Sequence, residues 1–103
     1  MEKHTPHYDL SVIKADVTRL GPAAFTRSTL ASGRHLGLTS RDMQQVIAGL
    51  QGKMLYKSMT TYLDQRIWQD VYCTHIESVE LYIKVTYRPG GGLPVISFKE
   101  KRP

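Results

Sequence analysis

Five side chains in the second half of the chain suit the cleavage of RNA: Lys57, Gln69, Tyr82, Lys84 and Lys99. Cleavage through the 2′-hydroxyl needs a group that takes the hydroxyl proton, donors that meet the charge on the phosphorane, and an acid for the leaving 5′-oxygen. An amine, an amide and a phenol can share these tasks. Each residue also has a commoner explanation, because Lys guards sheet edges, Gln bonds across strands and Tyr covers solvated sheet faces.

The stretch Tyr56–Tyr72 positions two of these side chains. Both ends of the stretch are rich in Tyr, Thr, Val, Ile and Trp, as half-buried strands are. The polar segment Leu63–Arg66 between them has the length of a hairpin loop. We therefore expect a hairpin in which Lys57 and Gln69 can face each other.

Two further strands are expected after the hairpin. Apolar and polar residues alternate over Val79–Tyr87, which places Tyr82 and Lys84 together on the face opposite the apolar residues. The glycine-rich segment Arg88–Pro94 predicts a flexible loop, and Val95–Phe98 predicts a final strand.

Apolar residues spaced by one helical turn predict three helices before the hairpin. Helices followed by four strands predict an α+β fold, with N-terminal helices packed on an antiparallel β-sheet, as one domain over residues 1–103. Asp9 is expected in the first turn of the first helix, where its charge is favourable to the helix dipole. Thr26 is expected to cap the second helix, and Thr39 the third in a capping box with Asp42. The expected ends are Gly21, Gly37 and Gly49–Gly52.

The composition favours a polyanionic partner. The chain has 14 Lys and Arg against nine Asp and Glu, which gives a formal charge of +5. A single cysteine excludes an intrachain disulfide, and no apolar run has the length of a membrane helix or a signal peptide, so a cytoplasmic protein is expected. The expected phosphate contacts are Lys53, Arg66, Lys84, Lys99, Lys101 and Arg102.

The histidines offer two other interpretations of the site. His4 and His7, with Cys73 and His75, supply four zinc-ligand side chains, although the Cys-x-His spacing is poor for a structural site. His7 with His75 can also act as an acid–base pair, because imidazole titrates near neutral pH. Cys73 has no sequence signature of a nucleophile.

The motifs of this hairpin resemble those of MqsR-like RNA interferases, the toxins of the motility quorum-sensing regulator family. The resemblance rests on KSMTTY, an Asp two residues later and IWQDVY. It extends to the opening MEKHTPHYDL, to Thr26-Arg27-Ser28 and to the closing segment Ile96–Lys101. The three consecutive glycines of residues 90–92 are more than we expect for that family.

The resemblance implies a RelE/YoeB-like fold and a ribosome-independent endoribonuclease that needs neither metal nor cofactor. It implies that Lys57, Gln69 and Tyr82 are the functional trio and that Lys99 supports phosphate binding. The substrate would be mRNA. The protein partner would be an MqsA-like antitoxin with a zinc-binding domain and a helix-turn-helix domain, through which contact with DNA would be indirect.

A second function remains open from the residues alone. A small basic regulator that binds RNA or DNA without catalysis has the same charge and the same sheet-face aromatics.

Overall fold

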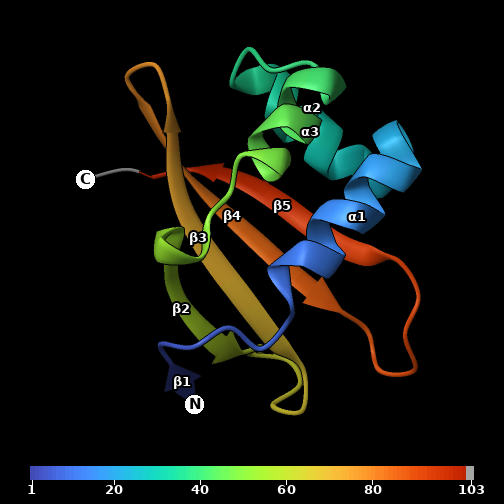
Figure 1. Ribbon diagram of the computed structural model, residues 1–103, viewed down its shortest axis with the longest axis vertical. Helices are drawn as coiled ribbons and strands as arrows, with labels where there is room; N and C mark the ends of the chain where they lie inside the picture. Colours follow the sequence, from blue (N-terminus) through green and yellow to red (C-terminus); the bar gives the residue numbers. More distant parts are fainter. Residues whose placement is uncertain (102–103) are drawn as a thin grey trace.

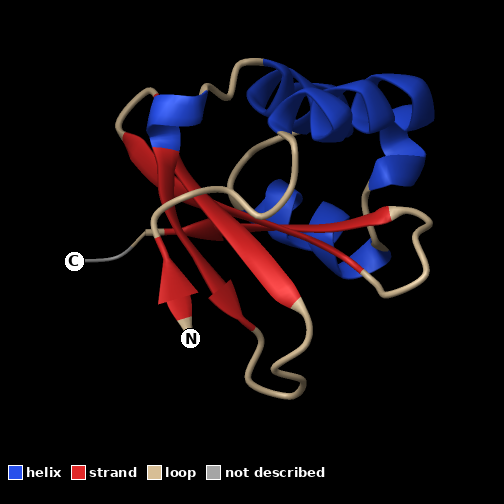
Figure 2. Cartoon of the chain, turned by 60° about the horizontal axis from the view of Figure 1, so that its bottom comes forward, coloured by secondary structure: helices blue, strands red, loops and turns tan. Residues whose placement is uncertain are grey.

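Three helices lie between the first strand of the β-sheet and its other four strands along the chain. In the computed structural model, which describes residues 1–101, the helices form one layer and the sheet forms another (Figure 1, Figure 2). The helical elements are α1 (Leu10–Leu20), the 3₁₀ turn η1 (Gly21–Ala24), α2 (Arg27–His35), α3 (Ser40–Ala48) and the 3₁₀ turn η2 (Gly52–Met54).

Thr26 and Thr39 are confirmed as N-caps, whereas Asp9, expected in the first turn of its helix, is the N-cap that precedes Leu10. Asp9 accepts a hydrogen bond from the backbone N–H of Ser11 at α1, and Thr26 accepts one from Thr29 at α2. Thr39 opens α3 in a complete capping box with Asp42. After α1, residues 21–24 form η1, because Pro22 fixes a helical φ at its first turn.

The sheet has five antiparallel strands in sequential order, from β1 to β5. The α+β class is therefore confirmed. The prediction of four strands was wrong by one, because β1 has only two residues and no alternating pattern can be recognised at that length. The strands are β1 (Glu2–Lys3), β2 (Leu55–Thr60), β3 (Trp68–Ile76), β4 (Val79–Tyr87) and β5 (Pro94–Glu100).

The core lies between the helices and one face of the sheet. Leu81, Ile83 and Val85 alternate along β4 toward the helices and are fully or almost fully buried. Residues of the helices complete this core, including Ile13, Val17, Met43 and Ile47. The opposite face of β4, with Tyr82 and Lys84, is only partly buried, because no helix covers that side (Figure 2).

Gly33 lies inside α2, where glycine costs about 1 kcal/mol relative to alanine. The packing explains it, because a Cβ at this position would overlap the Sδ atom of buried Met43. Glycine therefore permits the close approach of α2 and α3.

The N-terminal segment crosses the helix side of the sheet before α1 begins (Figure 1). The fully buried carboxylate of Asp70 on β3 holds this segment by accepting hydrogen bonds from the backbone N–H groups of His7 and Tyr8, at 2.9–3.1 Å. Ser58 on β2 donates a third bond to the same carboxylate at 2.6 Å. Asp70 thus fastens β1 and the following residues to the sheet.

Among the described residues, none of the helices is long and apolar enough to span a bilayer.

Candidate active site

The uncovered face of the sheet carries most of the residues that the sequence singled out. Strand register places Lys57 beside Val71 and Val71 beside Lys84, and it places Tyr82 beside Lys99. Partners in an antiparallel ladder point to the same side of a sheet. We call the set formed by Lys57, Gln69, Tyr82, Lys84 and Lys99 the open sheet face.

Gln69 belongs to this face because side chains alternate along β3. Asp70 and Tyr72 point toward the helices and are buried, so Gln69 and Val71 point to the other side. Gln69 pairs with Thr86 on β4 and with Met59 on β2. It therefore lies two residues along β3 from Val71, which is in the row that holds Lys57 and Lys84.

A β-bulge adds an aromatic side chain to the open sheet face. Leu55 pairs with Tyr72 and Lys57 pairs with Val71, which leaves Tyr56 as an extra residue on β2. The Tyr56 ring lies 5.8 Å from the Tyr82 ring, and the Lys57 Nζ lies 5.4 Å from the Tyr56 ring centroid. Without the bulge, Tyr56 and Lys57 would point to opposite faces.

Lys57 is held by a carboxylate of the N-terminal strand. Its Nζ donates a hydrogen bond of 3.0 Å to Oε1 of Glu2, and 24 % of the Lys57 side chain is exposed. This hydrogen bond raises the pKa of the Lys57 ammonium above its ordinary value. The same bond lowers the pKa of Glu2, so the pair is ionised at neutral pH.

Lys84 has the opposite electrostatic environment. Burial lowers the pKa of Lys84, and the positive charges of Lys99 and Lys57 lower it further. Lys84 is therefore repelled by the charges of both Lys99 and Lys57 across the open sheet face. A bound phosphate would relieve this repulsion and would favour the protonated form of Lys84.

Some of the expected phosphate contacts lie apart from this cluster. Lys53 is exposed in η2, and Arg66 lies in the β2–β3 loop with its guanidinium paired to a carboxylate of the same loop. Lys101, in contrast, lies at the open sheet face: it follows β5, and its Nζ is 5.8 Å from the centroid of the Tyr82 ring. Arg102 lies outside the described residues.

The structure does not bring the histidines together. The backbone of His7 is bound to Asp70, whereas His75 lies five residues farther along β3, which corresponds to about 16 Å of strand. The His7 ring instead stacks on Trp68 at 5.2 Å. Within residues 1–101, no three His, Cys, Asp or Glu side chains are grouped closely enough to hold a metal ion.

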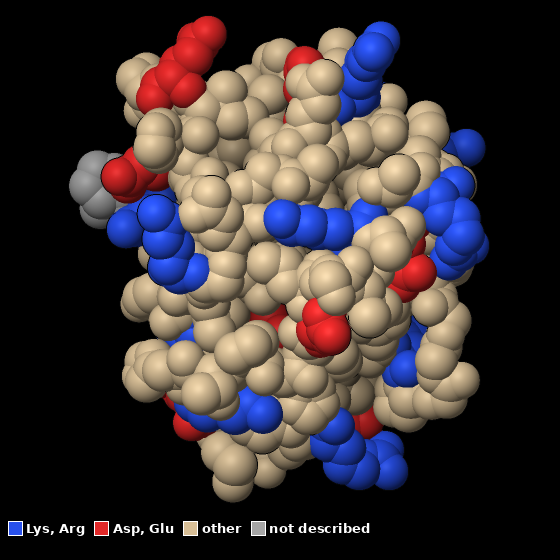
Figure 3. Space-filling view, in the orientation of Figure 1, with Lys and Arg blue, Asp and Glu red and all other residues tan. Residues whose placement is uncertain are grey.

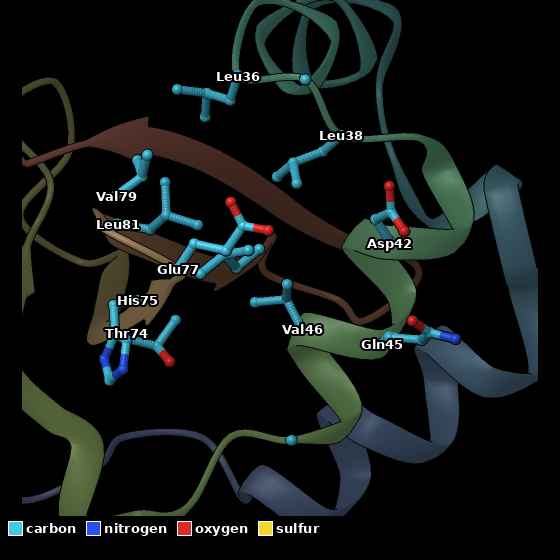
Figure 4. A pocket seen from close by; sticks show the side chains of 13 residues that line it. Leu36, Leu38, Asp42, Gln45, Val46, Thr74, His75, Glu77, Val79 and Leu81 are labelled. Atoms are coloured by element: carbon cyan, nitrogen blue, oxygen red, sulfur yellow. The ribbon is translucent and has the colours of Figure 1, made fainter.

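A cavity lies away from the open sheet face, between α3, the residues before it and the β3–β4 hairpin (Figure 4). Its volume is about 540 Å³. Its walls include Leu36, Leu38, Val46 and Leu81, and its described lining contains no Lys or Arg. A cavity lined by the carboxylates of Asp42 and Glu77 and by no Lys or Arg is a poor phosphate site, so an open cationic surface is the better candidate for a polyanion.

Basic residues are not gathered on the side of the molecule seen in Figure 3. Lys and Arg side chains are scattered there among acidic side chains and large uncharged areas. The total charge of +5 therefore does not by itself locate a binding surface. The strand register is what locates the cluster of three lysines.

Sequence reasoning missed Glu2 and Tyr56 as members of the site. Glu2 lies outside every helix and strand that the sequence predicts, and only its pairing in β1 places it beside Lys57. Tyr56 was recognised as aromatic, but regular alternation would have separated it from Lys57. No local sequence signal identifies either contact.

The fold and the face together define a small α+β protein with a cationic and aromatic sheet surface. The sequence profile of the family described as "Motility quorum-sensing regulator, toxin of MqsA" matches residues 5–100. The chain belongs to this family. It is also 44 % identical to the mRNA interferase toxin MqsR of Escherichia coli strain K12, over 101 residues that cover 98 % of this chain and 100 % of that protein.

Proposed function

We propose that this protein is a ribosome-independent endoribonuclease toxin that cleaves single-stranded mRNA by attack of the 2′-hydroxyl on the adjacent phosphate. The main support for this function is the open sheet face, where the ammonium groups of three lysines share one side of the sheet with a phenol and an amide. The name of the E. coli relative, an mRNA interferase toxin, supports the same activity. Family membership does not favour a non-catalytic regulator of RNA or DNA.

We assign a separate role to each member of the trio. Lys57, whose pKa is raised, is protonated at neutral pH and stabilises negative charge on the phosphorane. Gln69 orients the substrate through its amide. Tyr82 donates a proton to the leaving 5′-oxygen, while Lys84 and Lys99 bind phosphate oxygens.

The proposal includes a protein partner and a fold family. The family description, toxin of MqsA, supports neutralisation by a cognate MqsA-like antitoxin that has zinc-binding and helix-turn-helix domains. Helices followed by an antiparallel sheet are compatible with a RelE-like fold for residues 1–103 as one domain. Since mRNA is the substrate, the site of action is the cytoplasm.

The products of cleavage test this function. We expect one product to end in a 2′,3′-cyclic phosphate or 3′-phosphate and the other to begin with a 5′-hydroxyl, because the 2′-oxygen is the nucleophile. We also expect full activity in EDTA, because lysines supply the positive charge that a metal ion would otherwise provide. End analysis of a defined RNA measures both. Loss of cleavage in EDTA with recovery in Mg²⁺ contradicts the mechanism.

RNA affinity should fall as the salt concentration rises, because phosphate contacts by Lys and Arg release counterions. If four cations contact single-stranded RNA, a log–log plot of the binding constant against salt should have a slope of roughly −3, from about −0.7 per contact. Fluorescence anisotropy with an RNA that carries 2′-O-methyl groups measures binding without cleavage. An affinity that is independent of salt would exclude the open sheet face as the phosphate-binding surface.

A further inference from the structure

The trio contains no group suited to accept the proton of the 2′-hydroxyl at neutral pH. The amide of Gln69 is not basic. The hydrogen bond to Glu2 keeps Lys57 protonated by raising its pKa, so its amine is not free to act as a base. A base must therefore come from another side chain near Lys57.

Glu2 is placed where such a base is needed. Its backbone pairs with Met59 on β2, in the same row as Gln69 on β3, so its side chain belongs to the open sheet face. Its Oε1 lies 3.0 Å from the Lys57 Nζ, and 54 % of the side chain is exposed and within reach of a substrate. Glu2 also precedes the segment matched by the family profile, residues 5–100.

We propose that Glu2 is the general base of the cleavage reaction, an inference that rests on the proposed function. In a reactive geometry the 2′-oxygen and phosphorus are about 3 to 3.5 Å apart. A carboxylate and an ammonium separated by 3.0 Å can therefore contact the hydroxyl proton and a phosphate oxygen of one linkage.

The step is balanced in bonds and protons. The Glu2 carboxylate takes the 2′-hydroxyl proton as the 2′-oxygen forms its bond to phosphorus. The bond from phosphorus to the 5′-oxygen breaks, and the 5′-oxygen takes the proton of Tyr82. Glu2 then loses its proton to water, and the Tyr82 phenolate regains one from water.

The surroundings of Glu2 keep it ionised. The charged groups near it are Lys57 on β2, His4 in the N-terminal segment and the amino terminus of Met1. The hydrogen bond and charge of Lys57 lower the pKa of Glu2 most, and the other two groups act in the same direction. The carboxylate is therefore available as a base throughout the neutral range.

The first test replaces Glu2 by Gln, which keeps the size and the backbone pairing of the residue. We expect the single-turnover cleavage rate to fall by about a hundredfold to ten-thousandfold, the usual contribution of general base catalysis. RNA affinity should be equal or higher, because the variant loses a negative charge. A Glu2→Asp variant, which retains a carboxylate, should cleave faster than Glu2→Gln.

Glu80→Gln is the matched control, because Glu80 lies on the same side of β4 as Tyr82 and its carboxylate is 3.9 Å from the Lys101 Nζ. Its rate should match that of the parent. The proposal is overturned if Glu2→Gln cleaves at the parental rate or faster, or if a fall in its RNA affinity accounts for its defect. It is also overturned if Glu2→Asp cleaves no faster than Glu2→Gln.

A substrate with sulfur in place of the 5′-oxygen separates the base from the acid, because a thiolate leaves without protonation. The defect of Glu2→Gln should persist on this RNA, whereas the defect of Tyr82→Phe should disappear. If the sulfur restores Glu2→Gln instead, Glu2 is not the base. If Lys57→Ala, Gln69→Ala and Tyr82→Phe all retain parental rates on ordinary RNA, the proposed function itself fails.

Discussion

Replacing Lys57 by alanine should lower the single-turnover rate of RNA cleavage by about a hundredfold to a thousandfold. A preorganised donor that meets charge developing in the transition state contributes about 3 to 4 kcal/mol to the activation free energy. Lys57 is suited to this role because its ammonium is oriented by Glu2 and held in the charged form. Gln69→Ala should show a defect of similar size if the amide positions the phosphate.

Rapid-quench measurements at saturating RNA give the rate, and anisotropy gives the affinity. Lys14 is the matched control, because it is also a lysine but lies on α1, in the helix layer. Lys14→Ala should cleave at the parental rate. If Lys57→Ala cleaves like Lys14→Ala, Lys57 has no role in the transition state.

Replacing Asp70 by alanine should lower the free energy of unfolding by about 3 to 5 kcal/mol, since three donors would lose their acceptor and each unsatisfied buried donor costs about 1 to 3 kcal/mol. The three donors are the backbone N–H groups of His7 and Tyr8 and the hydroxyl of Ser58. The segment that carries Glu2 should also loosen. Urea unfolding measures the stability, and hydrogen exchange measures the opening of this segment.

Ser58→Ala provides a graded comparison for the same carboxylate. It removes one donor and leaves the two backbone bonds to Asp70 in place, so its cost should be nearer 1 kcal/mol. Exchange at His7 and Tyr8 should be faster in Asp70→Ala than in Ser58→Ala. Unfolding free energies within 1 kcal/mol of the parent for both variants would show that Asp70 does not anchor the N-terminal segment.

The helices and the alternation of β4 could be predicted because their signals are local. Thr39 and Asp42 form a capping box three residues apart, and the alternating residues of β4 decide which of its side chains face solvent. Tyr82 and Lys84 were therefore assigned to the correct face from the sequence. Local patterns of this kind do not require knowledge of the strand order.

The remaining parts of the site depend on pairing between distant segments. Glu2 and Lys57 are 55 residues apart, and their contact follows from a two-residue strand that leaves no periodic signal. The bulge at Tyr56 reverses the face that regular alternation predicts. The sequence placed Asp70 at the hairpin without revealing its function, because burial beneath the N-terminal segment is a tertiary property.

The Tyr82→Phe variant shows whether the open sheet face cleaves RNA or only binds it. This change keeps the aromatic ring beside Tyr56 and removes one hydroxyl group. At saturating concentration of a defined single-stranded RNA, without ribosomes, we expect a cleavage rate about a hundredfold lower and a dissociation constant within about threefold of the parent. A parental cleavage rate for Tyr82→Phe would contradict the role of the phenol as proton donor. Parental rates for all three variants, Tyr82→Phe, Lys57→Ala and Gln69→Ala, would contradict the assignment of catalysis to this face.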